Sequence, residues 1–388
     1  MLPSVFSRQT EFPTEPNLIT RRRAEQVANG RTILDLSGSN PTLVNLAIDA
    51  TILDGLSDAR ALLYEPEPLG LYTARLGLAQ RWAQMGHAQP PERIVLASST
   101  SEAYSHLFKL LCAPGDEVLV PRPSYPLFEQ LAQLEHVKLT TYQLEYDGGW
   151  YIDLDSLRSA RSPRTRAVIL VSPNNPTGSV TSSDELAAVV ALGLPIVSDE
   201  VFSRYLFDSA KARYCSALGQ SEALVFVLDG LSKSLGLPQC KLAWTSVTGP
   251  DRLVGAALER MEVISDAFLS VATPIQWALP ELLRREPERN HAIQTRLEAN
   301  LRELKRQVAG SAVTLLQLDG GWSAVLQVPS TRSETEWVLT WLEQDDLWIQ
   351  PGWFFDFARE AYVVVSLLTP EPAFTEGIAR LVRRVQAG

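Results

Sequence analysis

Four short polar segments in the middle of the chain hold residue types that can do chemistry. They are residues 98–101 (Ser-Ser-Thr-Ser), 172–178 (Ser-Pro-Asn-Asn-Pro-Thr-Gly), 198–201 (Ser-Asp-Glu-Val) and 230–237 (Gly-Leu-Ser-Lys-Ser-Leu-Gly-Leu). Each follows a short run of apolar, often β-branched residues that predicts a buried strand. Ligands of α/β proteins bind where such strands end, so these segments are candidates for one common site.

Each segment also has an interpretation that involves no chemistry. Hydroxyl groups and free backbone N–H groups at 98–101 suit a phosphate, but they also suit simple capping of the helix that follows. The turn formers at 172–178 are compatible with a tight connection alone. The buried carboxylate of Asp199 needs a cationic partner, and a structural ion pair would satisfy it. Lys233, taken alone, is compatible with a solvated lysine.

Alternating strand-like and helix-like segments are expected to position these residues. Strands are predicted at 93–97, 117–120, 167–171, 195–198, 224–228 and 242–247. Residues 101–111 are apolar at helical spacing, and 182–185 (Ser-Ser-Asp-Glu) form a capping box for a helix that ends before Gly193. The alternation predicts an α/β domain with a mostly parallel sheet.

The pattern changes after residue 280. A charged run at 284–289 precedes a helical pattern that continues to Gln307, whereas the first 50 residues contain no long periodic element. Strands at 322–328 and 362–368 and helices at 335–343 and from Glu371 are predicted beyond it. We therefore expect three parts. They are an arm at 1–54 that forms part of a small domain, a large domain at 55–280, and the rest of the small α+β domain at 281–388.

Composition and charge exclude several classes of partner. The 388 residues include 35 Lys and Arg against 45 Asp and Glu, which gives a formal net charge of −10. Nucleic acid and anionic membranes are therefore not expected partners. The three cysteines and four histidines do not show the spacing of metal ligands, so no metal is expected. Without a leader-like start or an apolar stretch near the roughly 20 residues that span a bilayer, we expect a soluble, cytoplasmic protein.

Together, the four segments resemble a known design. A Ser/Thr-rich turn, Asn-Pro-Thr-Gly, Asp-Glu after a strand, and Ser-Lys before a glycine occur in this order in the class I/II aminotransferases of the fold-type I pyridoxal-phosphate superfamily. The resemblance extends to 64–66 (Tyr-Glu-Pro) with Gly70, 39–41 (Ser-Asn-Pro), 123–126 (Pro-Ser-Tyr-Pro) and 350–352 (Gln-Pro-Gly) with Phe354. It implies a large domain with a mostly parallel seven-stranded sheet between helices, a smaller α+β domain, pyridoxal 5'-phosphate as cofactor, and a homodimer.

The resemblance also implies roles for individual residues. Lys233 would form the imine with the cofactor aldehyde and then carry the substrate proton, and Asp199 would keep the pyridine nitrogen protonated. Tyr125 would stack on the ring, and Asn175 would donate to its 3-oxygen. The implied phosphate ligands are Ser99, Thr100, Ser232 and Lys241, with Tyr64 of the partner subunit. The implied substrate contacts are Ser39, Asn40 and Asn175.

Three positions depart from the family pattern. Phe202 stands where the family usually has a tyrosine that also bonds the 3-oxygen, so that bond is absent unless Tyr205 supplies it. Lys241 stands where the family often has an arginine on the phosphate. Val364 stands where the family has the arginine that binds the substrate α-carboxylate. Either the alignment slips, another cation such as an arginine at 21–23 serves, or the substrate lacks an ordinary α-carboxylate.

The sequence therefore predicts a transaminase that moves an amino group between an amino donor, such as an amino acid, and an oxo acid through Lys233. Fold-type I C–S lyases, decarboxylases and cyclases share this apparatus and are alternatives. A non-catalytic binding protein is a third interpretation, which Lys233 and Asp199 disfavour. Trp322, Trp353 and Phe354 suggest an apolar wall near the substrate, but an aromatic cluster is as typical of plain core. The donor, the acceptor and the pathway do not follow from the sequence.

Overall fold

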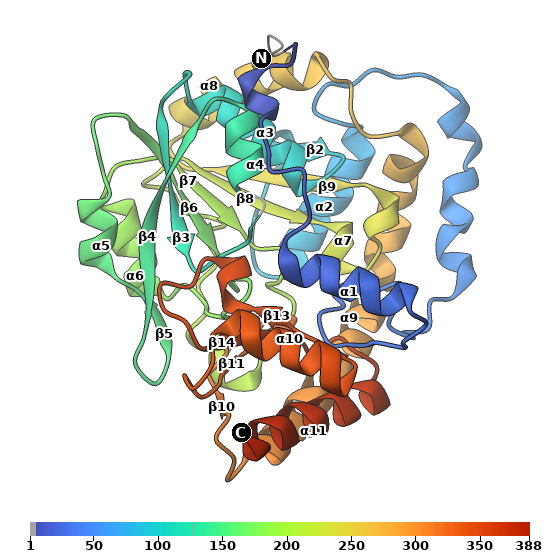
Figure 1. The fold of residues 1–388 in the computed structure, drawn as a ribbon. Helices are drawn as coiled ribbons and strands as arrows, with labels where there is room; N and C mark the ends of the chain where they lie inside the picture. The colour runs from blue at the N-terminus through green and yellow to red at the C-terminus, as the bar shows by residue number, and fades with distance from the viewer. Residues whose placement is uncertain (1–4, 127) are drawn as a thin grey trace.

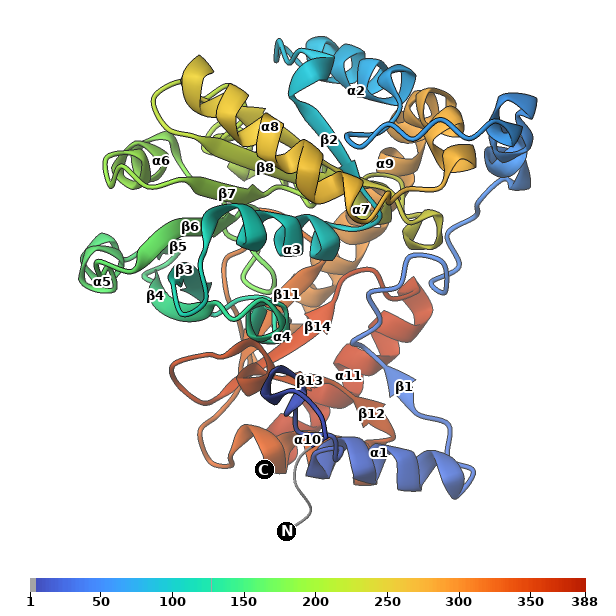
Figure 2. The ribbon, with the colours of Figure 1, turned by 90° about the horizontal axis from the view of Figure 1, so that it is seen from above.

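A large sheet with helices on both faces forms the centre of the molecule (Figures 1 and 2). The computed structural model describes residues 5–126 and 128–388. The strands of the large sheet lie in the order β2-β9-β8-β7-β6-β3-β4-β5. They are β2 (Ile94–Ala97), β3 (Glu117–Arg122), β4 (Lys138–Tyr146), β5 (Trp150–Ile152), β6 (Thr165–Val171), β7 (Ile196–Asp199), β8 (Val225–Gly230) and β9 (Ala243–Thr248). The predicted α/β class is confirmed.

The sheet is mostly parallel, as predicted, but it has eight strands rather than seven. The pairs β3–β4, β3–β6, β6–β7 and β7–β8 are parallel, whereas β9 is antiparallel to β2 and β8. The additional strand, β5, folds back antiparallel on the end of β4. Three of the four predicted segments follow the parallel strands β6, β7 and β8, whereas the segment at 98–101 follows the edge strand β2.

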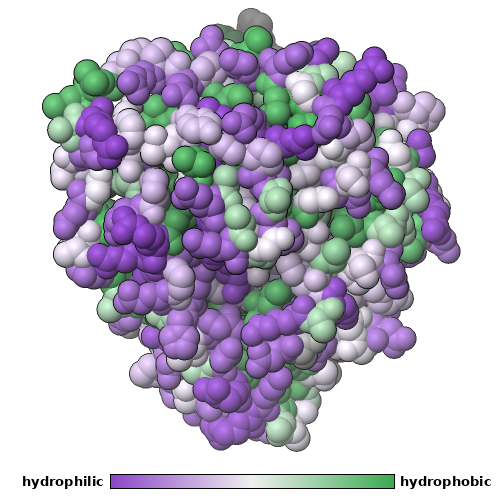
Figure 3. Space-filling view, turned by 180° about the vertical axis from the view of Figure 1, so that it is seen from behind, coloured by the Kyte–Doolittle hydropathy of each residue, from purple (hydrophilic) through white to green (hydrophobic). Residues whose placement is uncertain are grey.

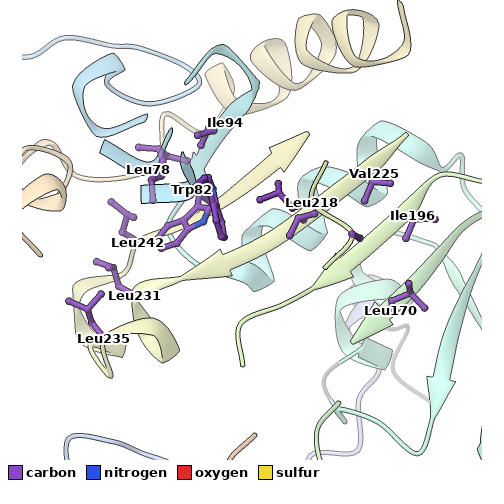
Figure 4. Close-up of a cluster of buried hydrophobic side chains, with 14 of the residues drawn as sticks. Leu78, Trp82, Ile94, Leu170, Ile196, Leu218, Val225, Leu231, Leu235 and Leu242 are labelled. Atoms are coloured by element: carbon purple, nitrogen blue, oxygen red, sulfur yellow. The ribbon is translucent and has the colours of Figure 1, made fainter. Parts of the chain in front are cut away.

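Two layers of helices bury the two faces of this sheet. One face is covered by α3 (Thr100–Leu111), α4 (Phe128–Leu134) and α8 (Asp251–Asp266). The other is covered by α2 (Tyr72–Gln84), α5 (Leu154–Ser159), α6 (Ser183–Val190) and the first part of α9 (Thr273–Val308). Figure 4 shows Leu78 and Trp82 of α2 near strand residue Ile94 in this second cluster. Full burial of each such apolar side chain stabilises the fold by roughly 1.5–3 kcal/mol.

A second, smaller sheet lies beside the large one. It has the order β10-β11-β14-β13 and is antiparallel throughout. Its strands are β10 (Thr314–Leu315), β11 (Ser323–Gln327), β13 (Gln350–Pro351) and β14 (Tyr362–Ser366), accompanied by α10 (Glu334–Asp345) and α11 (Glu371–Ala387). The strands and helices predicted for this part of the chain are thus present.

The N-terminal arm packs against this smaller sheet region. Its strand β1 (Leu34–Asp35) pairs in parallel with β12 (Leu347–Trp348). Contrary to the expectation of no long periodic element, the arm also contains a helix, α1 (Leu18–Ala28), which packs on α10. Only Ile19 of α1 is buried, so the helix has almost no apolar stripe for a periodicity argument to detect.

The helix α9 differs most from the sequence expectation. It runs without interruption from Thr273 to Val308, so the charged run at 284–289 lies inside it rather than before it. Its first buried residues belong to the core of the large sheet, and those from Ile293 onward belong to the core of the small sheet. The expected boundary between residues 280 and 281 falls within α9. The division at 54 and 280 therefore stays a prediction.

Short helices connect the larger elements. They are α7 (Leu231–Ser234) and the 3₁₀ helices at Arg8–Thr10, Ala50–Ser57, Ala59–Leu62, Pro91–Arg93, Asp208–Ala210, Pro238–Cys240 and Gly352–Phe355. In the part of the chain that the structure describes, no helix is long and apolar enough to cross a membrane. The face in Figure 3 mixes hydrophilic and hydrophobic residues, which is ordinary for a protein surface.

Candidate active site

Lys233 lies in the short helix α7, directly after strand β8. Gly230 at the end of β8 brings this segment close to β9, because a Cβ at Gly230 would come within 2.9 Å of the Ala243 Cβ. The Tyr205 hydroxyl donates to the backbone carbonyl of Lys233 at 2.5 Å and lies 3.1 Å from Asn290 Oδ1. The backbone that carries the lysine is therefore held on both sides.

The Lys233 amine faces aromatic rings rather than an anion. Its Nζ lies 4.9 Å from the centre of the Trp322 ring and 5.5 Å from that of Phe202. Among the described residues, no hydrogen-bond acceptor or carboxylate is paired with this nitrogen. Burial lowers the pKa of Lys233, and the charge of Asp199 opposes that shift only in part. Such an amine is neutral more readily than a surface lysine and is available as a nucleophile or base.

Asp199 ends strand β7 and has two hydrogen-bond donors. Its Oδ2 accepts from the Tyr104 hydroxyl at 3.0 Å, and its Oδ1 accepts from the backbone N–H of Val201 at 3.3 Å. Burial raises the pKa of Asp199 to about 6, while these two hydrogen bonds and the charge of Lys233 act in the opposite direction. A cation that carries its own N–H would therefore bind favourably against this carboxylate.

Tyr104 is not among the residues predicted from the sequence. It lies on α3, one turn after Thr100, and is 3% exposed. Burial raises its pKa well above the usual value, and the nearby charge of Asp199 adds to the shift. A tyrosine on the inner face of a helix is usual in a core, so the sequence carries no separate signal for its contact with Asp199.

Hydroxyl groups and the N-terminus of α3 form a polar end of the site. The Ser99 hydroxyl accepts from the backbone N–H of Glu102 at 3.1 Å and caps α3, which begins at Thr100. Ser232 and Lys241 line the same cavity. The positive end of the helix dipole and the ammonium group of Lys241 together suit an anion.

One cavity of about 330 Å³ brings most of the predicted residues together. Those that line it are Ser39, Ser99, Thr100, Tyr125, Asn175, Asp199, Ser232, Lys233 and Lys241. Two predicted residues do not line it. The Asn40 side chain accepts from the backbone N–H and hydroxyl of Thr42 in a local turn. Tyr64 is 74% exposed and does not line the cavity of its own chain, so its role in a partner subunit's site stays a prediction.

The aromatic residues near the site lie in different positions relative to the cavity. Phe202 packs edge-on against Trp322, with ring centres 5.3 Å apart, and both line the cavity, so Trp322 forms part of its wall. Phe354 lines a neighbouring cavity, whereas Trp353 lines neither of these two. The Tyr205 hydroxyl is engaged by the Lys233 carbonyl and Asn290, so it does not replace the hydroxyl that Phe202 lacks.

Val364 is fully inside strand β14. It is 1% exposed and lies opposite Val325 on one side and Gln350 on the other. The N-terminal arginines do not compensate for it, because none of residues 21–23 lines either cavity. Arg23 pairs instead with Asp35 at 2.6 Å.

The chain belongs to the family of class I and II aminotransferases, whose model matches residues 34–369. Glutamate-pyruvate aminotransferase AlaA of Escherichia coli K12 is 29% identical over 274 residues, which cover 69% of this chain and 67% of that protein. Nicotianamine aminotransferase A of Hordeum vulgare is 31% identical over 227 residues, or 55% and 48% of the two chains. The protein is therefore a pyridoxal-phosphate-dependent aminotransferase.

Solved structures show the same fold. Alanine aminotransferase from Pyrococcus furiosus is similar with a TM-score of 0.87 and 20% identity, over 95% of this chain and 96% of that one. A mutant of Thermus thermophilus aspartate aminotransferase has a TM-score of 0.85 and 20% identity, over 97% and 99% of the two chains. The predicted fold-type I architecture is thereby confirmed.

The residues present fit the functional groups of pyridoxal phosphate. Lys233 presents to the cavity an amine with no acceptor among the described residues, as an amine that bonds an aldehyde requires. Asp199 is a partly buried carboxylate at the cavity without a salt bridge among the described residues, which suits a protonated ring nitrogen. The α3 N-terminus, with Ser99, Ser232 and Lys241, suits a phosphate.

Proposed function

We propose that this aminotransferase works through the cavity that contains Lys233 and moves an amino group between a small amino donor and an oxo acid. The observation that carries the proposal is the half-buried amine of Lys233, which shares one cavity with the carboxylate of Asp199 and with the polar helix end at Ser99 that suits a phosphate. When bound, pyridoxal phosphate supplies an aldehyde that takes up an amine and a ring that accepts electrons.

The chain's own residues then have distinct tasks. Lys233 would hold the cofactor, and its amine, whose pKa is lowered by burial, is suited to take and return the proton of the substrate's amine-bearing carbon. Asp199 holds a proton on the ring nitrogen, and Tyr104 and the Val201 N–H keep that carboxylate oriented. Tyr125 and Asn175 line the same cavity and would contact the ring.

Borohydride reduction tests the anchor. Reduction of the cofactor-loaded protein should fix the cofactor to Lys233, and peptide mapping by mass spectrometry should locate it there. Lys233→Ala should lose the adduct, while the matched variant Lys241→Ala, which removes the other lysine that lines the cavity, should keep it. An adduct on Lys241 of the wild type would refute the assignment. An adduct in Lys233→Ala as abundant as that of the wild type would refute it as well.

We further propose that the active unit is a homodimer in which Tyr64 reaches the phosphate of the partner's site. Tyr64 and its neighbours Leu62 and Leu63 are large apolar residues left exposed on this chain, and such patches mark interfaces. Mixing Lys233→Ala with Tyr64→Ala should restore activity, because a mixed dimer contains one intact site. Two inactive variants that stay inactive after mixing, in a protein that elutes as a monomer, would contradict the shared site.

We also propose the cytoplasm as the location of the protein. Its three cysteines, Cys112, Cys215 and Cys240, are all free thiols, which fits a reducing compartment. Fractionation of cells that produce the protein should place it with cytoplasmic markers.

A further inference from the structure

A second cavity of about 340 Å³ adjoins the one at Lys233. The two share four lining residues, Ser39, Tyr125, Asn175 and Ser323. The rest of the second cavity is lined by Ser37, Pro126, Gln350, Phe354, Phe355 and Ser366. The second cavity is therefore open to groups of a molecule that reacts at the Lys233 amine.

The floor of the second cavity is one face of the small sheet. In its register, Ser323 lies opposite Ser366, and Val364 lies opposite both Val325 and Gln350. Directly opposed residues of antiparallel strands place their side chains on the same face, about 5 Å apart. Gln350 is therefore the polar neighbour of Val364 on the face that lines the cavity.

This cavity has no cationic side chain among the described residues that line it. Behind the wall, Asp35 accepts hydrogen bonds from the Ser37 N–H and hydroxyl at 2.7 and 2.6 Å, and Arg23 is already paired with Asp35. Lys241 lines only the first cavity, together with the polar end at Ser99. A carboxylate in the second cavity would lose hydration without gaining a counter-charge.

Neutral hydrogen-bonding groups are available there instead. The Gln350 carboxamide and the Ser39 hydroxyl make no hydrogen bond to another described residue. Asn175 uses its oxygen to accept from Ser323 at 3.3 Å, and its two amide N–H groups, one of which would serve the cofactor ring, make no hydrogen bond to another described residue. The Ser366 hydroxyl donates to the Gly38 carbonyl at 2.7 Å and accepts from the Leu368 N–H at 3.2 Å, which leaves it one lone pair as an acceptor.

We propose that the amino donor carries an uncharged polar group, a carboxamide or a hydroxymethyl group, on its amine-bearing carbon in place of a carboxylate. This inference rests on the proposed function of the Lys233 cavity. The Gln350 carboxamide both donates to and accepts from such a group, and Ser39 and Ser366 lie within the same wall. Oxo acids that serve as acceptors enter the same cavity with their carboxylate unpaired, so their KM is high.

Binding of matched amines tests the proposal independently of turnover. The probes are 2-aminoisobutyrate and its primary amide, which lack the hydrogen that the reaction removes, and calorimetry on the cofactor-loaded protein gives both Kd values. We expect the amide to bind at least about tenfold more tightly, which corresponds to about 1.4 kcal/mol. A carboxylate that binds as tightly as the amide, or more tightly, would overturn the inference.

Variants at Gln350 make the test specific to this wall. Gln350→Arg should reverse the preference toward the carboxylate. Gln350→Met, similar in length but unable to form the hydrogen bonds of the carboxamide, should weaken binding of the amide without favouring the carboxylate. Val364→Arg should act like Gln350→Arg if its circular dichroism spectrum and Tm match the wild type. Gln350 is partly exposed and is the safer site for a charge, whereas Val364 is buried. An unchanged preference in Gln350→Arg would also overturn the inference.

The half-reaction separates this inference from the function on which it rests. Absorbance of the loaded cofactor is followed after addition of L-alanine, L-alaninamide or 2-aminopropan-1-ol, and we expect the two compounds without a carboxylate to convert it faster. Faster conversion by L-alanine would refute the proposed donor without a carboxylate and leave the aminotransferase function intact. If none of the amines converts a cofactor that borohydride fixes to Lys233, the transfer reaction itself is refuted, and the inference falls with it.

Discussion

We expect the cofactor-free protein to become more stable when Asp199 is replaced by asparagine, a side chain of the same shape without the charge. Burial raises the pKa of Asp199 from 3.8 to about 6 in the folded chain. One pKa unit corresponds to about 1.4 kcal/mol, so an ionised Asp199 costs the fold up to about 3 kcal/mol above pH 6. The ionised carboxylate gains its cationic partner, the protonated ring nitrogen, only when the cofactor binds.

The sign and the pH window follow from the direction of the shift. The folded chain holds the Asp199 proton more tightly than the unfolded chain, so this group's stabilisation is complete below about pH 4 and is lost as the pH rises through about 6. Asparagine has one oxygen for the two donors, Tyr104 and the Val201 N–H, and the carboxylate is partly exposed to the cavity. We therefore expect a net gain of about 1–2 kcal/mol at pH 8 that vanishes toward pH 4.

Urea unfolding of the cofactor-free proteins at pH 5 and pH 8 measures this difference. The exposed Asp147, whose carboxylate makes no hydrogen bond among the described residues, provides the control variant Asp147→Asn, which should show no such pH dependence. Saturating pyridoxal phosphate should reverse the order of wild type and Asp199→Asn, because only the wild type keeps the ring nitrogen protonated. An Asp199→Asn protein that is less stable than wild type by the same amount at both pH values would refute the reasoning.

Three further variants test separate parts of the structure. Asp199→Ala should keep much of its phosphate-anchored affinity for pyridoxal phosphate but lose about 4 kcal/mol or more of transition-state stabilisation in kcat; near-normal turnover would contradict its electronic role. Arg204→Met removes the buried partner of Asp229 and Glu286 and should destabilise the fold by about 3–5 kcal/mol in urea, whereas the exposed Arg306→Met should cost less than about 1 kcal/mol. Phe202→Tyr should restore a donor to the ring 3-oxygen and lower the pKa of the Lys233–cofactor linkage in an absorbance titration; an unchanged or higher value would show that another donor already serves.

The cofactor end of the site follows well from the sequence because each of its parts is local. Ser99, Asn175, Asp199 and Lys233 stand in short motifs directly after strands that are apolar throughout. Parallel strands deliver their ends to one edge of a sheet, so a correct set of strands is enough to bring these residues together. The structure places all four on one cavity.

Elements without a strong local pattern were harder to predict. Strand β4 has only Tyr142 and Leu144 fully buried, so it lacks the continuous apolar run of the strands that were recognised. The charged run within α9 suggested an interruption, but its buried residues, including Glu286 and Arg289, continue the inner face of the helix. Some inner-face residues are charged and paired with other parts of the fold, as Glu286 is with Arg204. Apolar periodicity does not detect a helix at such positions.

The substrate end depends on pairings that no local pattern contains. Val364 can be recognised from the sequence as a departure, but what stands beside it depends on the register between β13 and β14. That register places Gln350 next to Val364, although 13 intervening residues separate them in the chain. Cross-strand neighbours of Val364 can take over the role of a charged side chain at that position, because they share its face at contact distance. The carboxamide of Gln350 is thus the group that defines what this cavity accepts, and a change of charge at that position is expected to change the substrate class while the Lys233 chemistry stays the same.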